Sequence, residues 1–85
     1  MKINRKKICT MYSTMIGDSK IEYGWFESGK AFIAKDEQIL TFAQAYKELV
    51  PKSGFNTSEK FYIGLDAYPK TTGGIIRYLI HKYNR

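Results

Sequence analysis

Two tight-turn signals in the first third of this chain, Gly17-Asp18 and Ser28-Gly29, constrain its fold more than any other feature. Glycine beside a small polar residue, between stretches rich in isoleucine, threonine and tyrosine, is typical of β-hairpins. Because each turn joins neighbouring segments, the segments pair in chain order. The sequence therefore predicts an antiparallel meander of three strands, over residues 8–16, 19–27 and 30–35.

A helix is predicted after the meander. Thr41 fits the N-cap position, and Gln44 three residues later completes a capping box. The apolar residues that follow recur at the spacing of one buried helix face, and Pro51 ends the helix. Asp36 and Glu37 are assigned to the turn before it.

The last third of the chain is predicted to hold one strand and one helix. Residues 61–65 form a fourth strand, and a loop over 67–74 follows it. Residues 75–83 have the isoleucine and tyrosine content of a strand but the periodicity of an amphipathic helix, and periodicity is the stronger signal. The element order β-β-β-α-β-α predicts an α+β fold with a single layer of helices on a sheet. We expect one small domain over residues 1–85 that begins with a basic arm over 1–7.

The excess positive charge is concentrated at the two ends of the chain. Residues 1–8 and 70–85 each carry four lysines or arginines and no acid, and the net charge is +6. If the two ends meet in the fold, they form one basic patch that would attract a polyanion. If they lie on opposite sides, that interpretation loses its basis. The candidate residues for contacting nucleic acid or a partner are Lys2, Arg5, Lys6, Lys7, Lys70, Arg77, His81, Lys82 and Arg85.

The carboxy-terminal charges recur along one side of the predicted last helix. Arg77, His81 and Arg85 are spaced four residues apart, which gives a stripe that suits a phosphate backbone or an acidic protein surface. The same pattern is typical of a solvated helix face, where cations complement the helix dipole. Residues 70–74, Lys-Thr-Thr-Gly-Gly, are either an anion-binding helix start or an ordinary loop and cap.

The turn positions set a register and therefore the two faces of the sheet. Tyr12 is expected opposite Tyr23, and Trp25 opposite both Thr10 and Phe32. The other face then carries Cys9, Met11, Met15, Phe26, Ala31 and Ile33. The aromatic face could stack bases, but a small domain needs its large side chains inside, which favours a core under a helix. The candidate aromatic contacts are Tyr12, Tyr23, Trp25 and, in the loop over 52–60, Phe55; Tyr68 is a further candidate anchor.

Catalysis is not predicted. His81 is the only histidine and Cys9 the only cysteine, and one of each is too few for a metal site. No cofactor and no metal are expected. A lone cysteine and the lack of a long apolar run predict a soluble protein of a reducing, cytoplasmic compartment that does not contact a membrane.

The leading hypothesis is a small non-enzymatic binding protein that docks on a nucleic acid or on a nucleoprotein machine, through an acidic or nucleic-acid-binding protein surface. Its size and its lysine, isoleucine and tyrosine bias suit a phage- or mobile-element-encoded inhibitor of a host enzyme or defence complex. The first alternative is a direct DNA- or RNA-binding accessory protein that uses the basic arm and the last helix. The β-β-β-α opening resembles, in element order, modules that place a three-stranded sheet in a DNA groove, such as integrase arm-binding domains. A small enzyme using His81 or Cys9 is the least favoured hypothesis.

Overall fold

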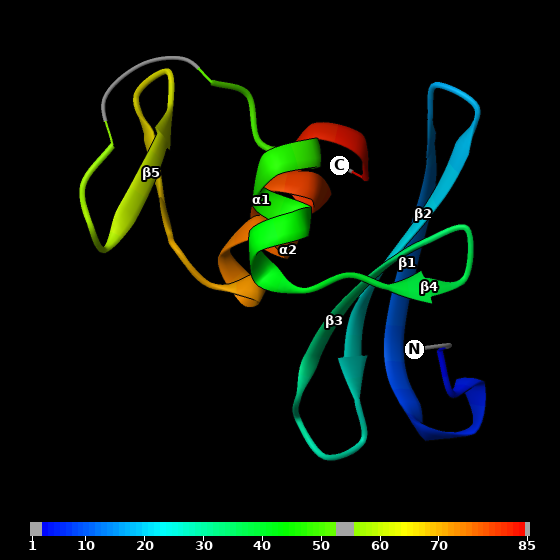
Figure 1. The fold of residues 1–85 in the computed structure, drawn as a ribbon. Coiled ribbons are helices and arrows are strands. Elements are labelled where there is room, and N and C mark those ends of the chain that lie inside the picture. The colour runs from blue at the N-terminus through cyan, green and yellow to red at the C-terminus, as the bar shows by residue number, and fades with distance from the viewer. Residues whose placement is uncertain (1–2, 53–55, 85) are drawn as a thin grey trace.

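The chain adopts a mixed α+β fold, as predicted. The computed structural model describes residues 3–52 and 56–84, so Lys2, Phe55 and Arg85 lie outside the described residues. It contains a four-stranded antiparallel sheet, two helices and a second, two-stranded sheet (Figure 1). Two of these elements, the short fourth strand of the larger sheet and the second strand of the smaller one, were not predicted.

The larger sheet has the strand order β1-β2-β3-β4. Its strands are β1 (Ile8–Ile16), β2 (Ser19–Phe26), β3 (Ala31–Lys35) and β4 (Gln38–Ile39). The predicted register of the first hairpin is confirmed, with Tyr12 opposite Tyr23 and Thr10 opposite Trp25. Gly17 in the connecting turn has φ 62°, the left-handed conformation that a two-residue hairpin turn requires.

The register predicted for the second hairpin is wrong by one residue. Trp25 lies opposite Ala31, where Phe32 was expected. Because successive strand residues point to opposite faces, Phe32 shares its face with Phe26, and Ala31 shares its face with Trp25. The two rings of Phe26 and Phe32 stack with centroids 4.6 Å apart.

A longer turn accounts for this shift. The amide of Phe26 donates to the carbonyl of Lys30, which closes a three-residue loop where two residues were expected. Gly29 has φ 90° in this loop, and three-residue hairpin loops place glycine at such a left-handed position. A second irregularity is a bulge in β1 between Ile8 and Thr10, which places Ile8 opposite Phe26.

Asp36 and Glu37 form the turn between β3 and β4. Both have positive φ, 48° and 71°, as a type I′ hairpin turn requires. The turn is tied to β2, because the Asp36 carboxylate accepts a hydrogen bond from the Lys20 amide at 2.9 Å. The assignment of these two residues to a turn is therefore confirmed, and the short β4 that follows is the addition to the predicted meander.

Helix α1 (Phe42–Leu49) forms as predicted. The Thr41 hydroxyl accepts from the Gln44 amide, and the Gln44 side chain accepts from the Thr41 amide, which completes the capping box. Val50 closes the helix and is buried, and Pro51 follows it. Local sequence signals at both ends were sufficient to place this helix.

The predicted fourth strand does not join the larger sheet. It is β5 (Lys60–Ile63), and it pairs with β6 (Asp66–Pro69) in a separate two-stranded sheet. The loop predicted over residues 67–74 is thus wrong at both ends, because residues 67–69 belong to β6 and residues 72–74 belong to the helix that follows, α2 (Thr72–Tyr83). Gly64, with φ 62°, provides the tight turn, and Phe61 stacks on Tyr68 with centroids 5.3 Å apart.

Helix α2 (Thr72–Tyr83) confirms the helical interpretation of the last segment and begins three residues earlier than predicted. The Thr71 hydroxyl caps it by accepting from the Gly74 amide at 3.0 Å. A Cβ on Gly74 would lie 1.9 Å from the Pro69 carbonyl oxygen, so only glycine lets the helix start this close to β6. Within residues 70–74, Thr71 therefore caps helix α2, and Gly74 lets the helix pack closely against Pro69 of β6.

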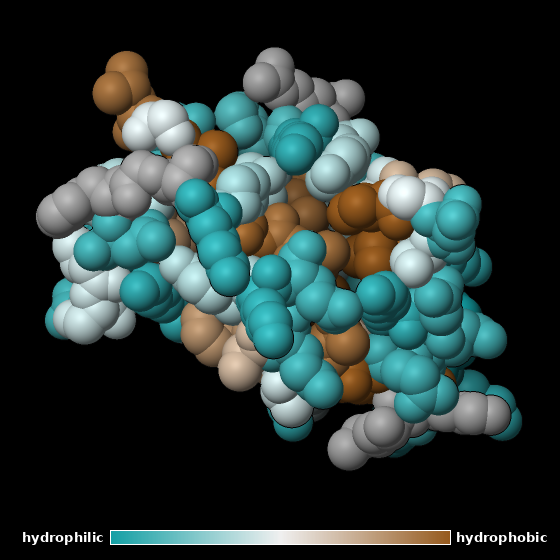
Figure 2. Space-filling model, turned by 45° about the horizontal axis from the view of Figure 1, so that its top comes forward, coloured by the Kyte–Doolittle hydropathy of each residue, from teal (hydrophilic) through white to brown (hydrophobic). Residues whose placement is uncertain are grey.

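Both helices lie on the same side of the larger sheet (Figure 1). Ile75, Ile76 and Leu79 of α2 are buried with Tyr23 and Ile33 of the sheet in one core cluster. We call the face under α2 the inner face and the opposite one the outer face. On the outer face Met11 and Met15 keep 39% and 61% of their surface exposed. Viewed over the α1 side, hydrophilic side chains cover most of the surface, and apolar ones show in the hollow at its centre (Figure 2).

Candidate functional site

The amino-terminal cations belong to the outer face. Arg5, Lys6 and Lys7 form a 3-10 helix, η1 (Arg5–Lys7), which is capped by Asn4. The Arg5 guanidinium makes two hydrogen bonds to the Glu22 carboxylate, at 2.9 and 3.0 Å, and one to Glu37 at 2.7 Å. These hydrogen bonds, those to Glu22 first, raise the pKa of Arg5 above its ordinary value. The Ile3 amide also donates to the Glu37 carbonyl, so the segment predicted as an arm is attached to the β3–β4 turn at Ile3 and to β2 through Arg5.

Glu22 explains why this contact matters to the fold. Its residue is only 1% exposed, although it carries a carboxylate. A buried carboxylate without a partner is strongly unfavourable, and a bidentate guanidinium satisfies both of its oxygens. Arg5 was predicted as a recognition residue, and the structure places it in an ion pair that the fold requires.

Arg5 and the last turn of α2 lie on opposite faces of the larger sheet. Arg5 reaches Glu22 on the outer face, whereas α2 packs on the inner face and its last turn meets Tyr23, whose hydroxyl donates to the Asn84 side chain. Consecutive residues of a strand point to opposite sides, so Glu22 and Tyr23 mark the two faces. The described cations of the two ends therefore do not form the single basic patch considered in the sequence, and among them the condition set for the polyanion interpretation is not met.

The carboxy-terminal cations are distributed around α2 and its start. Lys82 Nζ lies 5.8 and 5.3 Å from the ring centroids of Tyr78 and Tyr83, and Lys70 Nζ lies 5.6 Å from that of Tyr46. The contact with the Tyr78 hydroxyl raises the pKa of Lys82. These two lysines thus lie against aromatic rings.

Arg77 differs from Arg5, which is held in an ion pair, and from Lys70 and Lys82, which lie against aromatic rings. Its side chain is exposed, and within residues 3–52 and 56–84 no carboxylate lies within ion-pair distance of it. His81 follows one helical turn later on the same side of α2, with Nδ1 3.4 Å from the Tyr68 hydroxyl. Arg77 and His81 therefore lie side by side on the exposed helix face between β6 and the larger sheet.

The candidate aromatic contacts divide into buried and accessible residues. Tyr23 is fully buried, so the core interpretation is right for it. Tyr12 stacks on Tyr23 with centroids 6.1 Å apart, and both Tyr12 and Trp25 are only half-buried at the rim of the core. Cross-strand pairing makes Tyr12 and Trp25 diagonal neighbours on the inner face. Two of the predicted aromatic contacts are therefore accessible beside α2.

The two accessible aromatic residues meet Arg77 and His81 in one place. A shallow depression of about 460 Å³ is lined by Tyr12, Trp25, Arg77, Ile80 and His81. A second depression of about 310 Å³ is lined by Asp66, Ala67, Tyr68, Arg77 and His81. The two depressions share Arg77 and His81, so they form one continuous surface. We call it the recognition surface and define it by Tyr12, Trp25, Tyr68, Arg77, Ile80 and His81.

The sequence contained this surface only as separate parts. The spacing of Arg77 and His81 and the pairing around Tyr12 were both predicted, but no local pattern shows that α2 crosses the sheet beside Tyr12 and Trp25. Ile80 is half-buried at the edge of the apolar face of α2. Tertiary packing brings these parts together.

The remaining candidates for chemistry are metal ligands, Cys9 and His81. Among them, no group of three or more histidine, cysteine, aspartate or glutamate side chains could hold a metal ion. Cys9 is exposed at the bulge in β1, and it is not among the residues that line the depressions around His81. In the part of the chain that the structure describes, no helix is long and apolar enough to cross a membrane.

Comparisons of the chain with protein-family models, with curated proteins and with solved structures found no match.

Proposed function

We propose that this chain is a small non-enzymatic binding protein that docks on a protein partner through the recognition surface. One observation carries the proposal: a tyrosine, a tryptophan and an arginine from three different elements line the same depression. These are the residue types that most often dominate the binding energy of protein interfaces. Their half-exposed rings leave apolar area that a partner would bury.

The surface also specifies the chemistry of its partner. Arg77 is exposed without a carboxylate of its own, so a partner carboxylate would complete a charge-assisted hydrogen bond there. The depression beside Tyr12 and Trp25 has room for a large apolar side chain. We therefore expect an acidic protein surface on which a carboxylate and an apolar or aromatic side chain lie close together.

Direct nucleic-acid binding remains a prediction with a weaker basis. Binding to a phosphate backbone gains affinity from several simultaneous cation–phosphate contacts. Arg5 lies on the outer face, and Arg77 is the only lysine or arginine among the described residues that line the two depressions. The recognition surface thus provides few contacts of the required kind.

Inhibition of the partner is a further prediction. The hypothesis that the chain is a phage- or mobile-element-encoded inhibitor of a host enzyme or defence complex rests on its size and composition. An inhibitor of this kind would act by occupying the partner's surface, which needs only the docking proposed here.

Affinity capture from a nuclease-treated bacterial lysate tests the proposal. We expect the wild-type chain to retain a stoichiometric protein, and the double variant Trp25→Ala with Arg77→Ala to lose it. Lys47→Ala, an exposed cation on α1, is the matched control and should capture as the wild type does. The same capture from an untreated lysate is the comparison. A protein that is retained only without nuclease, or that the double variant also retains, would overturn the proposed docking surface.

A further inference from the structure

Among residues 3–52 and 56–84, no strand pairs with the first residues of β3 on the side away from β2, and we call this side the free edge of β3. The short strand β4 pairs only with the end of β3, where Ala34 lies opposite Ile39 and Lys35 opposite Gln38. The last backbone contact between them is the Leu40 amide donating to the Ile33 carbonyl. Beyond it the chain leaves for α1, so β4 does not cover the segment 30–32.

The backbone at this edge points outward at Ala31. The Phe26 amide donates to the Lys30 carbonyl, so Lys30 is turned toward β2. Hydrogen-bonded and non-hydrogen-bonded pairs alternate along an antiparallel ladder, and Ala31 opposite Trp25 is therefore a non-hydrogen-bonded pair. The N–H and C=O of Ala31 face away from β2, toward the side that β4 leaves uncovered. Such a pair of groups is the template on which another strand can add.

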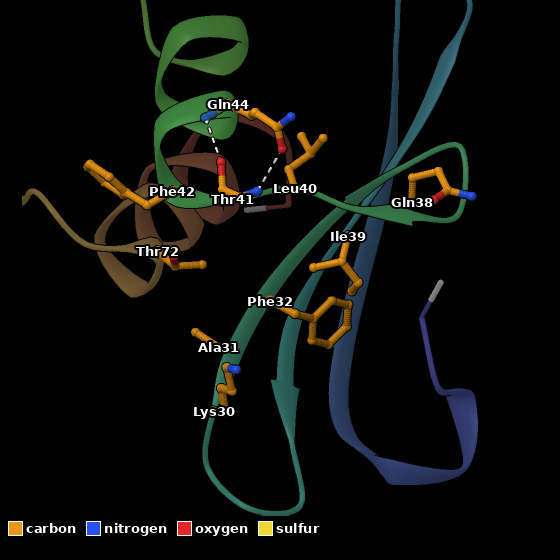
Figure 3. A pocket seen from close by; sticks show the side chains of 10 residues that line it. All are labelled: Lys30, Ala31, Phe32, Gln38, Ile39, Leu40, Thr41, Phe42, Gln44 and Thr72. Atoms are coloured by element: carbon orange, nitrogen blue, oxygen red, sulfur yellow. Dashed lines mark hydrogen bonds between the residues drawn. The ribbon is translucent and has the colours of Figure 1, made fainter. Parts of the chain in front are cut away.

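A depression flanks this edge on each side. The outer one, of about 480 Å³, lies over the stacked rings of Phe26 and Phe32 and reaches Lys7. The other, of about 620 Å³, extends toward Phe42 and Thr72 on the side of the helices (Figure 3). Both are lined by Lys30, Ala31, Phe32 and Ile39.

We propose that the free edge of β3 binds an extended, acidic and apolar peptide segment of a partner protein as an added strand. Successive side chains of a strand point to opposite faces, so consecutive apolar side chains of the peptide would enter the two depressions in turn. The backbone of the peptide would bond to Ala31. This site uses none of the residues of the recognition surface and does not depend on it.

Charge complementarity identifies the peptide as acidic. Lys7 and Lys30 lie at the outer depression, and among the described residues no carboxylate lines either depression. A carboxylate of the peptide, next to the apolar side chain that enters the outer depression, would therefore lie near two lysines and near no acid that repels it. The charge pairs are exposed and are expected to set specificity and orientation more than affinity.

The test is a titration of the ¹⁵N-labelled full chain with the peptide acetyl-Asp-Leu-Val-Leu-Asp-amide, followed by amide NMR spectra. We expect saturable shifts that are largest at Ala31 and its neighbours, together with slower hydrogen exchange of the Ala31 amide. The same peptide with an N-methylated central valine loses its backbone donor and should bind roughly fivefold more weakly. A lysine-flanked version should bind more weakly still.

Variants of the chain give an independent check. Ala31→Pro removes the outward N–H from a position outside the β2 ladder, and edge strands tolerate proline there. It should weaken the peptide roughly fivefold. Lys7→Glu with Lys30→Glu should reverse the preference for acidic over basic flanks, whereas Lys47→Glu on α1 should leave it unchanged.

Three results would overturn the proposal. The first is an absence of shifts at Ala31 up to millimolar peptide. The second is a set of shifts confined to the recognition surface. The third is the same shifts on raising the protein concentration alone, which would make a second copy of the chain the occupant of the edge.

Discussion

The two faces of the larger sheet use their positive charge in different ways. On the outer face, Arg5 is bonded to the buried carboxylate of Glu22 and to Glu37. On the inner side, Arg77 stands exposed beside Tyr12 and Trp25, without an acid within ion-pair distance in the described part of the chain. Two basic ends of the same formal charge thus have different roles: Arg5 at the amino end satisfies a buried acid, and Arg77 at the carboxyl end is available to a partner.

The faces also differ in how they are covered. The inner face carries the core, because α2 buries Tyr23 and Ile33 completely. The outer face is covered at Glu22 by Arg5 and leaves Met11 and Met15 exposed. Stability should therefore depend strongly on α2 and on Arg5, whereas binding should depend on Arg77 and its aromatic neighbours.

The largest expected effect is on the inner face. Leu79 is fully buried in α2, so Leu79→Ala should lower the free energy of unfolding by about 2–5 kcal/mol. Met15→Ala on the outer face removes a side chain that is 61% exposed and should change it by less than about 0.5 kcal/mol. Urea unfolding of the two variants measures this contrast, and equal losses would contradict the division into inner and outer faces.

The next effect separates the two arginines. Arg5→Ala leaves the Glu22 carboxylate buried without its bidentate partner and should lower the melting temperature clearly, whereas Arg77→Ala should leave it unchanged. The double variant Arg5→Ala with Glu22→Gln removes the buried charge as well and should recover part of the loss. Thermal unfolding followed by circular dichroism checks all three. An unstable Arg77→Ala variant, or a fully stable Arg5→Ala variant, would contradict the claim that Arg5 stabilises the fold and Arg77 does not.

A smaller effect concerns Tyr23 and alkaline pH. Burial, and then the nearby Tyr83, raise the pKa of Tyr23 above its ordinary value of 10.0. A raised pKa means that the fold favours the neutral phenol, so this contribution to stability is fully present below pH ~10 and is lost as the pH rises through the folded-state pKa. Tyr23→Phe loses the hydrogen bond to Asn84 and should be less stable by about 1 kcal/mol at neutral pH. Urea titrations should show that this difference in stability becomes smaller above pH ~10. A difference that grows there would mean that the pKa of Tyr23 is not raised in the folded state.

Local signals were enough to predict much of the fold. The capping box of α1, the Gly17 turn and the periodicity of α2 each lie within a few residues, and each was placed correctly. The second hairpin was misread because Ser28-Gly29 is compatible with a two-residue or a three-residue loop, and that choice moves Phe32 to the other face. The pairing of β5 with β6 was missed because Tyr68-Pro69 resembles a loop and proline is tolerated only at a strand edge or end.

The candidate site could be predicted only as parts. Arg77, His81, Tyr12 and Trp25 were all identified from spacing and residue type, but their meeting depends on where α2 crosses the sheet. The role of Arg5 could not be predicted either, because the burial of Glu22 on the outer face follows from register and not from its neighbours in sequence. Charge counted along the chain therefore overestimated the charge available to a partner.

The most direct test uses Trp25, the only tryptophan of the chain, which lines the recognition surface. Its fluorescence can be followed while the chain is titrated with its nuclease-resistant protein partner and, separately, with single-stranded and duplex oligonucleotides at low salt. The account predicts a saturable change with the protein, weakened about thirtyfold in Arg77→Ala, and no change with the oligonucleotides. A saturable response to oligonucleotides that falls steeply with salt, and no response to the protein, would contradict it.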